Sequence, residues 1–411
     1  MTRVLVRRLV LLLAPLLLSW SLLTPGALAF SEGQQLYNEA WRTINGAYLD
    51  PTFNHQNWYL LREKALKQLN LNRAQDAYQP IRDLLARLDD PFTRFLEPDQ
   101  YRGLQVSTSG ELSGVGLQIG FADEGLQIVV IAPIEGSPAA AAGVAPGDRI
   151  TAIDDQPVTG LSLDEAATRL RGPAGTTVSL TIEREGQARR FSLQRDRISL
   201  NPVVAEVKDR PNGGKVGYLR LSQFNANAPM EVAHALSRLE QRGADAFILD
   251  LRNNPGGLLT AGIEIGRYLI DEGTIVYTVN RQGVFDSYEA RGQQITDKPL
   301  VVLVNRGTAS ASEILAGALQ DNGRAQLVGD RTFGKGLIQS LFELSDGSGL
   351  AVTVAKYETP AHHDINQQGI QPDTLVTLEE PLAPEQIATE ADPQYQAALT
   401  LLTPRAIAHA S

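Results

Sequence analysis

The chain has 411 residues, of which 43% are hydrophobic and 20% charged, and its formal net charge is −10 at pH 7. This length suits two to four domains, the composition is that of a globular protein, and the acidic balance argues against a nucleic-acid partner. The chain contains no cysteine, which excludes disulfides, thiol nucleophiles and cysteine-based metal sites.

The amino terminus has the features of a signal peptide over residues 1–29. Three arginines precede an apolar stretch over residues 9–23, and residues 27–29 supply a small-x-small cleavage site. The apolar stretch is short for the roughly 20 residues of a membrane-spanning helix. We therefore expect cleavage after Ala29 and export of the mature chain, with an uncleaved anchor as the alternative.

Residues 30–103 predict a small helical domain. Apolar side chains recur there at three- and four-residue spacing, which is typical of helices that bury one face. The side chains with this spacing are Leu36, Ala40, Trp41, Ile44 and Tyr48, then Leu61, Ala65, Leu66 and Leu69, then Ile81, Leu84, Leu85 and Leu88.

Residues 104–196 change to short strands, glycine turns and one helix over residues 163–170. Glycines precede a strand at residues 118–121, where a dinucleotide-binding fingerprint would need a helix. Backbone N–H groups before a strand can instead hold a peptide's terminal carboxylate. The order of elements resembles a PDZ domain, an α+β fold that reads carboxyl-terminal tails. The resemblance implies that the N–H groups at its mouth are those of Val115, Gly116 and Leu117. An ordinary β-meander is the alternative.

The residue that follows the predicted helix, Arg171, is hypothesised to link tail binding to the active site, as in regulated relatives of this domain arrangement.

Residues 197–411 alternate strands with helices, which predicts an α/β core with a parallel or mixed sheet and a site at the strand ends. The predicted strands are residues 216–221, 246–249 and 300–304, and the predicted helices are residues 232–239 and 261–269. We expect a final helix over residues 394–402 to pack back onto this core.

The catalytic candidate is Ser310, which stands in a small-residue turn between strand 300–304 and an apolar helical stretch over residues 313–319. Free N–H groups at a helix start suit a nucleophile that must face an oxyanion. A serine attacks an amide only if a base takes its proton, and the glycine-flanked Lys335 can do so if burial keeps its amine neutral. Gln339 can hold that amine by a hydrogen bond without charging it.

Two other interpretations of these residues are open. Ser310 and Glu313 have the spacing of a capping box, a structural motif at helix starts. Residues 329–335 fit the phosphate-loop pattern G-x-x-x-x-G-K, but Gly336 stands where a serine or threonine is required. Strand formers then follow where a phosphate loop needs a helix.

An oxyanion needs two donors. The N–H of Ala311, directly after the serine, is one candidate. The second is the N–H of Gly256, in a Pro-Gly-Gly turn after strand 246–249, because a glycine turn lets the backbone approach a ligand closely. An ordinary glycine turn is the alternative.

Together these motifs resemble the carboxyl-terminal processing peptidases, a family of serine–lysine endopeptidases with a PDZ domain. The residues that carry the resemblance are 250–257, 307–314 and 332–336 with Gln339, and it covers nearly the whole mature chain. It implies a crotonase-like α/β catalytic core. It assigns the nucleophile to Ser310, the general base to Lys335, the orientation of the base to Gln339, the oxyanion hole to Gly256 and Ala311, and a further acid of the site to Asp321.

Residues 53–58, 110–117 and 357–360 are similar to the branch of this family found in oxygenic phototrophs. That branch trims the C-terminal extension of the photosystem II reaction-centre protein precursor in the thylakoid lumen, which frees the trimmed end to help ligate the manganese cluster. The resemblance implies a lumenal or periplasmic enzyme, a protein substrate with a C-terminal extension, and contact with the membrane only through that substrate.

We expect no cofactor and no metal site, because the one ligand-like cluster, residues 362–364, has no partner motif. Three other functions are open: a general exported protease that degrades faulty proteins by their tails, a non-catalytic binder on the same core fold, and a PDZ scaffold alone.

Overall fold

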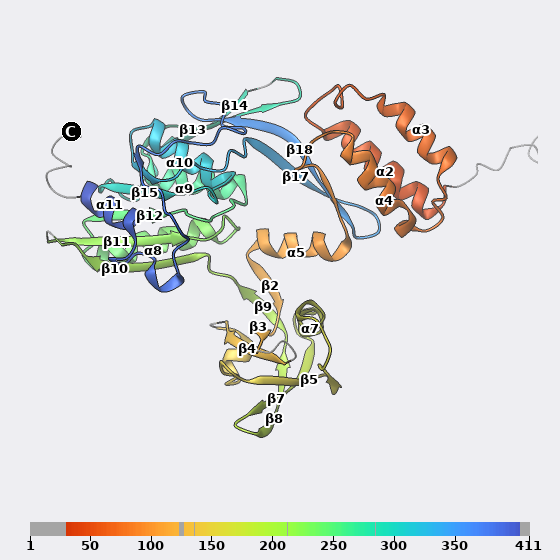
Figure 1. The fold of residues 1–411 in the computed structure, drawn as a ribbon, viewed down its shortest axis with the longest axis horizontal. Coiled ribbons are helices and arrows are strands. Elements are labelled where there is room, and N and C mark those ends of the chain that lie inside the picture. The colour runs from red at the N-terminus through yellow and green to blue at the C-terminus, as the bar shows by residue number, and fades with distance from the viewer. Residues whose placement is uncertain (1–29, 123–126, 135, 212, 284, 403–411) are drawn as a thin grey trace, which may run out of the picture. The chain divides into compact units, whose positions relative to one another are not determined.

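The computed structural model describes residues 30–122, 127–134, 136–211, 213–283 and 285–402, so the predicted signal peptide lies outside the described residues. The chain forms two compact units, whose elements are labelled in Figure 1. The first unit takes the chain up to Tyr101 together with Gln339–Thr353, and the second takes Arg102–Ile338 together with Val354 onward. Among the described helices, none is both long and apolar enough to cross a membrane.

The first unit is helical, as predicted from residues 30–103. Its α-helices are α2 (Glu32–Ala47), α3 (Trp58–Gln68) and α4 (Tyr78–Ala86), and a 3-10 turn covers Ala74–Ala77. Helix α2 buries Leu36, Ala40 and Ile44 on one face, as their spacing predicts. Leu69 instead stands at the C-cap of α3 and is 42% exposed.

The first unit also contains a segment from the predicted catalytic region. Strand β18 (Gly349–Glu358) begins in this segment, and its residues Gly349–Ala351 pair antiparallel with β1 (Arg94–Leu96). Helix α5 (Pro98–Ser109) runs across the expected boundary between residues 103 and 104. These boundaries depend on strand pairing between distant segments, which local periodicity does not encode.

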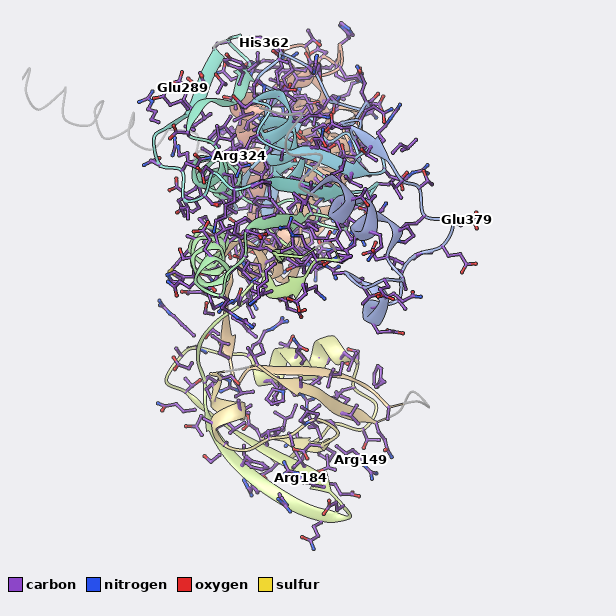
Figure 2. The ribbon with its side chains drawn as sticks, turned by 90° about the vertical axis from the view of Figure 1, so that its left-hand side faces the viewer. Arg149, Arg184, Glu289, Arg324, His362 and Glu379 are labelled. Atoms are coloured by element: carbon purple, nitrogen blue, oxygen red, sulfur yellow. The ribbon has the colours of Figure 1, made fainter. Side chains whose placement is uncertain are left out.

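The second unit begins with the elements of a PDZ domain. Its sheet has the order β3-β4-β5-β7-β8, with β6 paired to β5, and a ribbon of β2 and β9 flanks it in sequence. The elements are β2 (Glu111–Gly114), β3 (Leu117–Phe121), β4 (Ile128–Pro133), α6 (Pro138–Ala141), β5 (Arg149–Ile153), β6 (Gln156–Pro157), α7 (Leu163–Leu170), β7 (Thr177–Arg184), β8 (Gln187–Gln194) and β9 (Asp196–Ser199). Arg184, which is labelled in Figure 2, donates to the buried Asp148 at 2.6 Å, and this bond fixes the turn before β5.

The catalytic region contains a six-stranded sheet of order β10-β11-β12-β15-β16-β19, in which only the β10-β11 pair is antiparallel. Its strands are β10 (Val203–Asp209), β11 (Lys215–Leu221), β12 (Ala246–Asp250), β15 (Leu300–Val304), β16 (Gln326–Gly329) and β19 (Thr374–Leu375). Every residue of β12 and β15 is buried, as expected of parallel strands that are covered on both faces. Their carboxyl ends lie at the same edge of the sheet.

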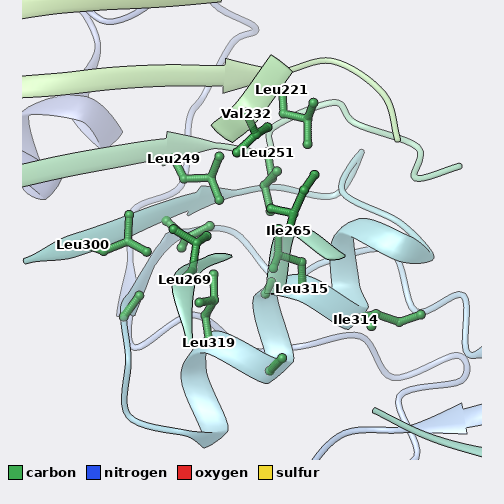
Figure 3. Close-up of a cluster of buried hydrophobic side chains, with 14 of the residues drawn as sticks. Leu221, Val232, Leu249, Leu251, Ile265, Leu269, Leu300, Ile314, Leu315 and Leu319 are labelled. Atoms are coloured by element: carbon green, nitrogen blue, oxygen red, sulfur yellow. The ribbon is translucent and has the colours of Figure 1, made fainter. Parts of the chain in front are cut away.

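Helices cover both faces of this sheet. One apolar cluster joins Leu249 and Val302 to α8 (Ala228–Gln241), α9 (Leu259–Leu269) and α10 (Ala311–Asp321), as Figure 3 shows for part of it. A second cluster joins Ile248 and Val301 to α11 (Pro393–Leu401), the predicted final helix. Because side chains alternate between the two faces of a strand, Leu249 and Val302 pack against the helices on one face and Ile248 and Val301 against α11 on the other. Each fully buried aliphatic side chain contributes about 1.5–3 kcal/mol to this packing.

Two further strands belong to the second unit, and a third runs from it into the first unit at Gln339. Strand β13 (Glu272–Asn280) pairs with β14 (Phe285–Arg291) and with Ala355–Glu358 of β18. Strand β17 (Leu337–Glu343) follows directly after the glycine-flanked Lys335. A strand at this place excludes the phosphate-loop interpretation, which needs a helix there.

Candidate active site

Ser310 stands in a strained turn between β15 and α10. Its φ of 57° and ψ of −120° lie outside the regions that L-residues adopt easily. Two bonds from the preceding residues hold the turn: Thr308 Oγ1 donates to the Leu251 carbonyl at 2.9 Å, and the Ala309 N–H donates to the Asn254 carbonyl at 3.0 Å. Backbone strain of about 1–3 kcal/mol that the surroundings impose in this way is common at functional turns.

The capping-box alternative is only half realised. The N–H of Ser310 donates to Oε2 of Glu313 at 2.9 Å, as the motif requires. The N–H of Glu313, however, donates to the carbonyl oxygen of Ser310 at 2.8 Å, and the Ser310 side chain makes no capping hydrogen bond. The hydroxyl is therefore not committed to the start of the helix.

Glu313 joins the serine turn to the lysine turn. Its side chain is fully buried, and Oε2 accepts the N–H of Lys335 at 2.9 Å as well as that of Ser310. Oε1 accepts the N–H of Gly334 at 2.7 Å and the hydroxyl of Thr332 at 2.5 Å. One carboxylate thus fixes the main chains of two residues that are far apart in sequence.

Gly256 lies directly against the serine turn. Its φ is 94°, and a Cβ at this position would stand 2.6 Å from the Ala309 carbonyl oxygen and 2.9 Å from the Ala311 nitrogen. Only glycine fits such an approach, so this is more than an ordinary glycine turn. The N–H of Gly256 donates to Oδ1 of the buried Asn254 at 2.9 Å. The two candidate oxyanion donors are therefore adjacent, and one of them already has a partner.

A buried ion network anchors the glycine turn. Arg252 is 6% exposed and pairs with Asp250 at 2.6 Å and with Asp392 at 2.8 Å. Asp392 caps α11, so the network connects the last helix to the end of β12. Burial by itself raises the pKa of Asp392, but the hydrogen bonds and the charge of Arg252, with the N–H of Ala388, outweigh it and lower that pKa below its usual value.

The other predicted site residues lie as follows. Lys335 is half-buried, and Ala311 is buried at the start of α10. Asp321 ends α10 and accepts the N–H of Ala361 at 2.9 Å. Gln339 belongs to the first unit, where its Nε2 donates to Thr353 Oγ1 at 3.4 Å. The structure thus joins Lys335 to the serine turn through Glu313, while the roles of Gln339 and Asp321 stay predictions.

The predicted tail-binding residues stand at the start of β3. Val115 and Gly116 are buried, and Leu117 is the first residue of the strand. Gly116 has a φ of 75°, and a Cβ there would lie 2.2 Å from the Cβ of Ser137, so the turn requires glycine. Arg171 is the C-cap of α7 and is exposed. The carboxylate-binding role of these N–H groups and the coupling role of Arg171 stay predictions.

The sheet edge that carries Ser310 also contains a cavity of about 360 Å³, lined in part by Arg252, Asn305 and Arg306. Neither Ser310 nor Lys335 is among its described lining residues, so the chemistry is assigned from the hydrogen bonds and not from the cavity. Within the described part of the chain, no group of three or more histidine, aspartate or glutamate side chains is placed to hold a metal ion.

Sequence reasoning missed two residues that shape this site. Glu313 was noticed only as a possible helix cap, although an acid inside an otherwise apolar helix, Ile314 to Leu319, is itself a signal of a buried partner. Asp392 carried no signal near the site, because it meets Arg252 only through the tertiary fold.

Comparisons with known proteins agree with this geometry. Residues 215–376 match Peptidase family S41, and residues 129–184 match a PDZ domain. A carboxyl-terminal-processing protease of Synechocystis is 62% identical over 94% of this chain and 91% of its own length. A chloroplastic carboxyl-terminal-processing peptidase of Arabidopsis thaliana is 48% identical over 85% of this chain and 70% of its own.

Among solved structures, the photosystem II D1 C-terminal processing protease is similar, with 42% identity and a TM-score of 0.58 over 89% of this chain and 100% of that one. These relatives cover both the PDZ domain and the peptidase core of the chain. The chain therefore belongs to peptidase family S41, as a C-terminal processing peptidase of the serine type.

Proposed function

We propose that Ser310 is the nucleophile and Lys335 the general base of this peptidase. The observation that carries the proposal is the buried carboxylate of Glu313, which accepts the N–H groups of both residues. The neutral amine of Lys335 takes the proton of the Ser310 hydroxyl as that oxygen attacks the scissile carbonyl. The resulting ammonium protonates the leaving amine, and water activated by the same lysine then hydrolyses the acyl-enzyme.

The N–H groups of Ala311 and Gly256 hold the oxyanion in this proposal. Their adjacency supports the pairing, since a Cβ on Gly256 would stand 2.9 Å from the Ala311 nitrogen. Gly256 has to exchange its hydrogen bond to Asn254 Oδ1 for one to the oxyanion. A donor aimed at the charge that develops during the reaction stabilises the transition state. Gln339 orients the lysine amine, and Asp321 is the further acid of the site.

The PDZ domain binds the carboxyl-terminal tail of the substrate. The tail adds a strand beside β3 (Leu117–Phe121), and the N–H groups of Val115, Gly116 and Leu117 receive its carboxylate. Tethering in this way raises the effective concentration of the scissile bond at the serine. Arg171 couples the binding of the tail in the PDZ domain to the activity of the catalytic core.

The substrate is the photosystem II reaction-centre protein precursor, whose C-terminal extension is removed so that the manganese cluster can assemble. Support comes from the similar solved structure, a photosystem II D1 C-terminal processing protease, and from the chloroplastic relative. The site of action is the thylakoid lumen. Residues 1–29, acting as a signal peptide, would direct export of the chain to that compartment.

The test is incubation of the mature protein with a synthetic peptide of the precursor tail, followed by mass spectrometry. The wild-type protein is expected to release the extension, and Ser310→Ala and Lys335→Ala are expected to leave it intact. Unrelated apolar tails form the second arm of the experiment. Equal cleavage of those tails would replace the photosystem substrate by a general tail-specific protease.

A further inference from the structure

Tyr357 on β18 touches the main chains of both proposed dyad residues. Its hydroxyl donates to the carbonyl oxygen of Lys335 at 2.6 Å and lies 3.2 Å from that of Ser310. Its own N–H donates to the carbonyl oxygen of Gly336 at 3.0 Å. The residue directly after the lysine and the lysine itself are thus both bonded to one tyrosine.

The surroundings of Tyr357 favour a permanent, neutral donor. The side chain is 1% exposed, and its strand is itself paired, with Tyr357 opposite Thr278 of β13. Burial, with the nearby carboxylates of Glu313 and Asp364, raises the pKa of Tyr357 well above its usual value. The phenol is therefore a neutral donor at neutral pH.

Glu313 and Tyr357 bind the main chain on the two sides of the same residues, Ser310 and Lys335: the carboxylate meets the peptide unit before each residue and the phenol the unit after it. Glu313 accepts the N–H groups of Ser310 and Lys335, and Tyr357 lies within hydrogen-bond distance of their carbonyl oxygens. A phenol has one proton, and the shorter distance assigns it to the Lys335 carbonyl. The phenol oxygen also lies 3.2 Å from the carbonyl oxygen of Ser310. That carbonyl already accepts the N–H of Ile314 at 3.0 Å.

We propose that Tyr357 is a positioning residue for the Ser310–Lys335 dyad, acting through the peptide unit of the lysine. This inference rests on the proposed function, since it presumes that these two residues carry out the reaction. Without the hydroxyl, the Lys335 carbonyl loses this donor, while the N–H bonds of the turn to Glu313 and the main-chain bond between Gly336 and residue 357 remain, so the peptide unit after the lysine is held less firmly. The amine then spends less time in line with the serine hydroxyl, while the substrate-binding surfaces are untouched.

The test compares Tyr357→Phe with the wild-type enzyme on the tailed peptide and measures kcat and KM separately. A positioning role predicts that kcat falls at least about tenfold, because the serine and the lysine of the enzyme–substrate complex are aligned for a smaller fraction of the time. KM is expected to stay within about twofold, because substrate binding is unchanged. The matched control is Tyr395→Phe, which removes the hydroxyl of another buried tyrosine of the core, on α11, and is expected to keep wild-type kcat.

A second variant separates the lost donor from lost packing. Incorporation of 4-fluorophenylalanine at position 357 fills the volume of the hydroxyl but cannot donate, and it is expected to show the same fall in kcat. Wild-type kcat in either the phenylalanine or the fluorinated variant would overturn the inference, even if that variant melted at a lower temperature.

Failure of the proposed function would look different from failure of this inference. In the first case the wild-type reaction itself leaves the peptide uncut, or Ser310→Ala still cuts it. In the second case Ser310→Ala is inert while Tyr357→Phe turns over at the wild-type rate.

Discussion

Glu313→Gln tests whether one carboxylate fixes the turn of Ser310 relative to the turn of Lys335. The substitution keeps the size of the side chain but replaces one oxygen by an NH₂ group. Each carboxylate oxygen accepts two hydrogen bonds, with the N–H groups of Ser310 and Lys335 on Oε2 and with Thr332 and Gly334 on Oε1. Whichever oxygen is replaced, two donors lose their acceptor and face a third donor.

The expected magnitude follows from those bonds. A hydrogen bond to a charged group is worth about 1.5–3 kcal/mol, so two lost bonds weaken the junction by about 3–6 kcal/mol. If about half of the loss appears as misalignment of the dyad, kcat/KM falls about 10- to 100-fold, since each 1.4 kcal/mol is a factor of ten. The melting temperature is expected to fall as well, because Glu313 is fully buried.

The assay is cleavage of the tailed peptide, followed by mass spectrometry, with a thermal melt of each protein. The control is Glu165→Gln, which alters an exposed capping-box glutamate whose side chain accepts hydrogen bonds from the N–H and the hydroxyl of Ser162. It is expected to keep kcat/KM within about twofold, as surface changes usually do. A Glu313→Gln enzyme within threefold of wild-type kcat/KM would refute the bridging argument.

Four further outcomes are expected. Gly256→Ala should abolish cleavage and lower the melting temperature, because its Cβ would stand 2.6 Å from the Ala309 carbonyl oxygen; a fully active variant would contradict the close approach. Asp392→Asn should destabilise the fold by about 1.5–3 kcal/mol in denaturant titrations, since Arg252 keeps Asp250 but loses its second charged acceptor. The lowered pKa of Asp392 means that its contribution is present at neutral pH and is lost as the pH falls through that lowered value, so the gap between wild type and variant should narrow in acid. Activity should rise from pH 5 toward pH 8, and a flat profile would argue against a lysine base. Arg171→Ala should slow cleavage of tailed substrates, and unchanged rates would remove its coupling role.

The parts of the site that sequence predicted are those set by local chemistry. The buried strand Leu300–Val304, the small-residue turn and the helix after it appear where periodicity put them, because each depends on neighbours in the chain. The glycine turn after strand 246–249 was predicted as a place where the backbone can approach a ligand, because glycine adopts a positive φ easily; its approach to the serine turn depends on the fold.

The parts that sequence could not predict depend on contacts between distant segments. The Glu313 bonds to Gly334 and Lys335 exist only once the strand order brings the two turns together, and the local motif indicated a helix cap. The inclusion of Gln339–Thr353 in the helical first unit likewise rests on strand pairing with Arg94–Leu96. Gln339 therefore belongs to a different unit from the lysine that it was predicted to orient.

The attachment of α11 to Arg252 makes the glycine turn of this protease depend on a segment far along the chain. Asp392 starts α11 and also neutralises a guanidinium in the turn that leads to Gly256. A molecule that trimmed itself back past Asp392 would remove one of the two carboxylates that pair with the buried Arg252 and would weaken the anchor of its glycine turn. Self-digestion from the end that this enzyme attacks in others would thus be self-limiting, and affinity tags or truncations at this end would best leave the helix whole.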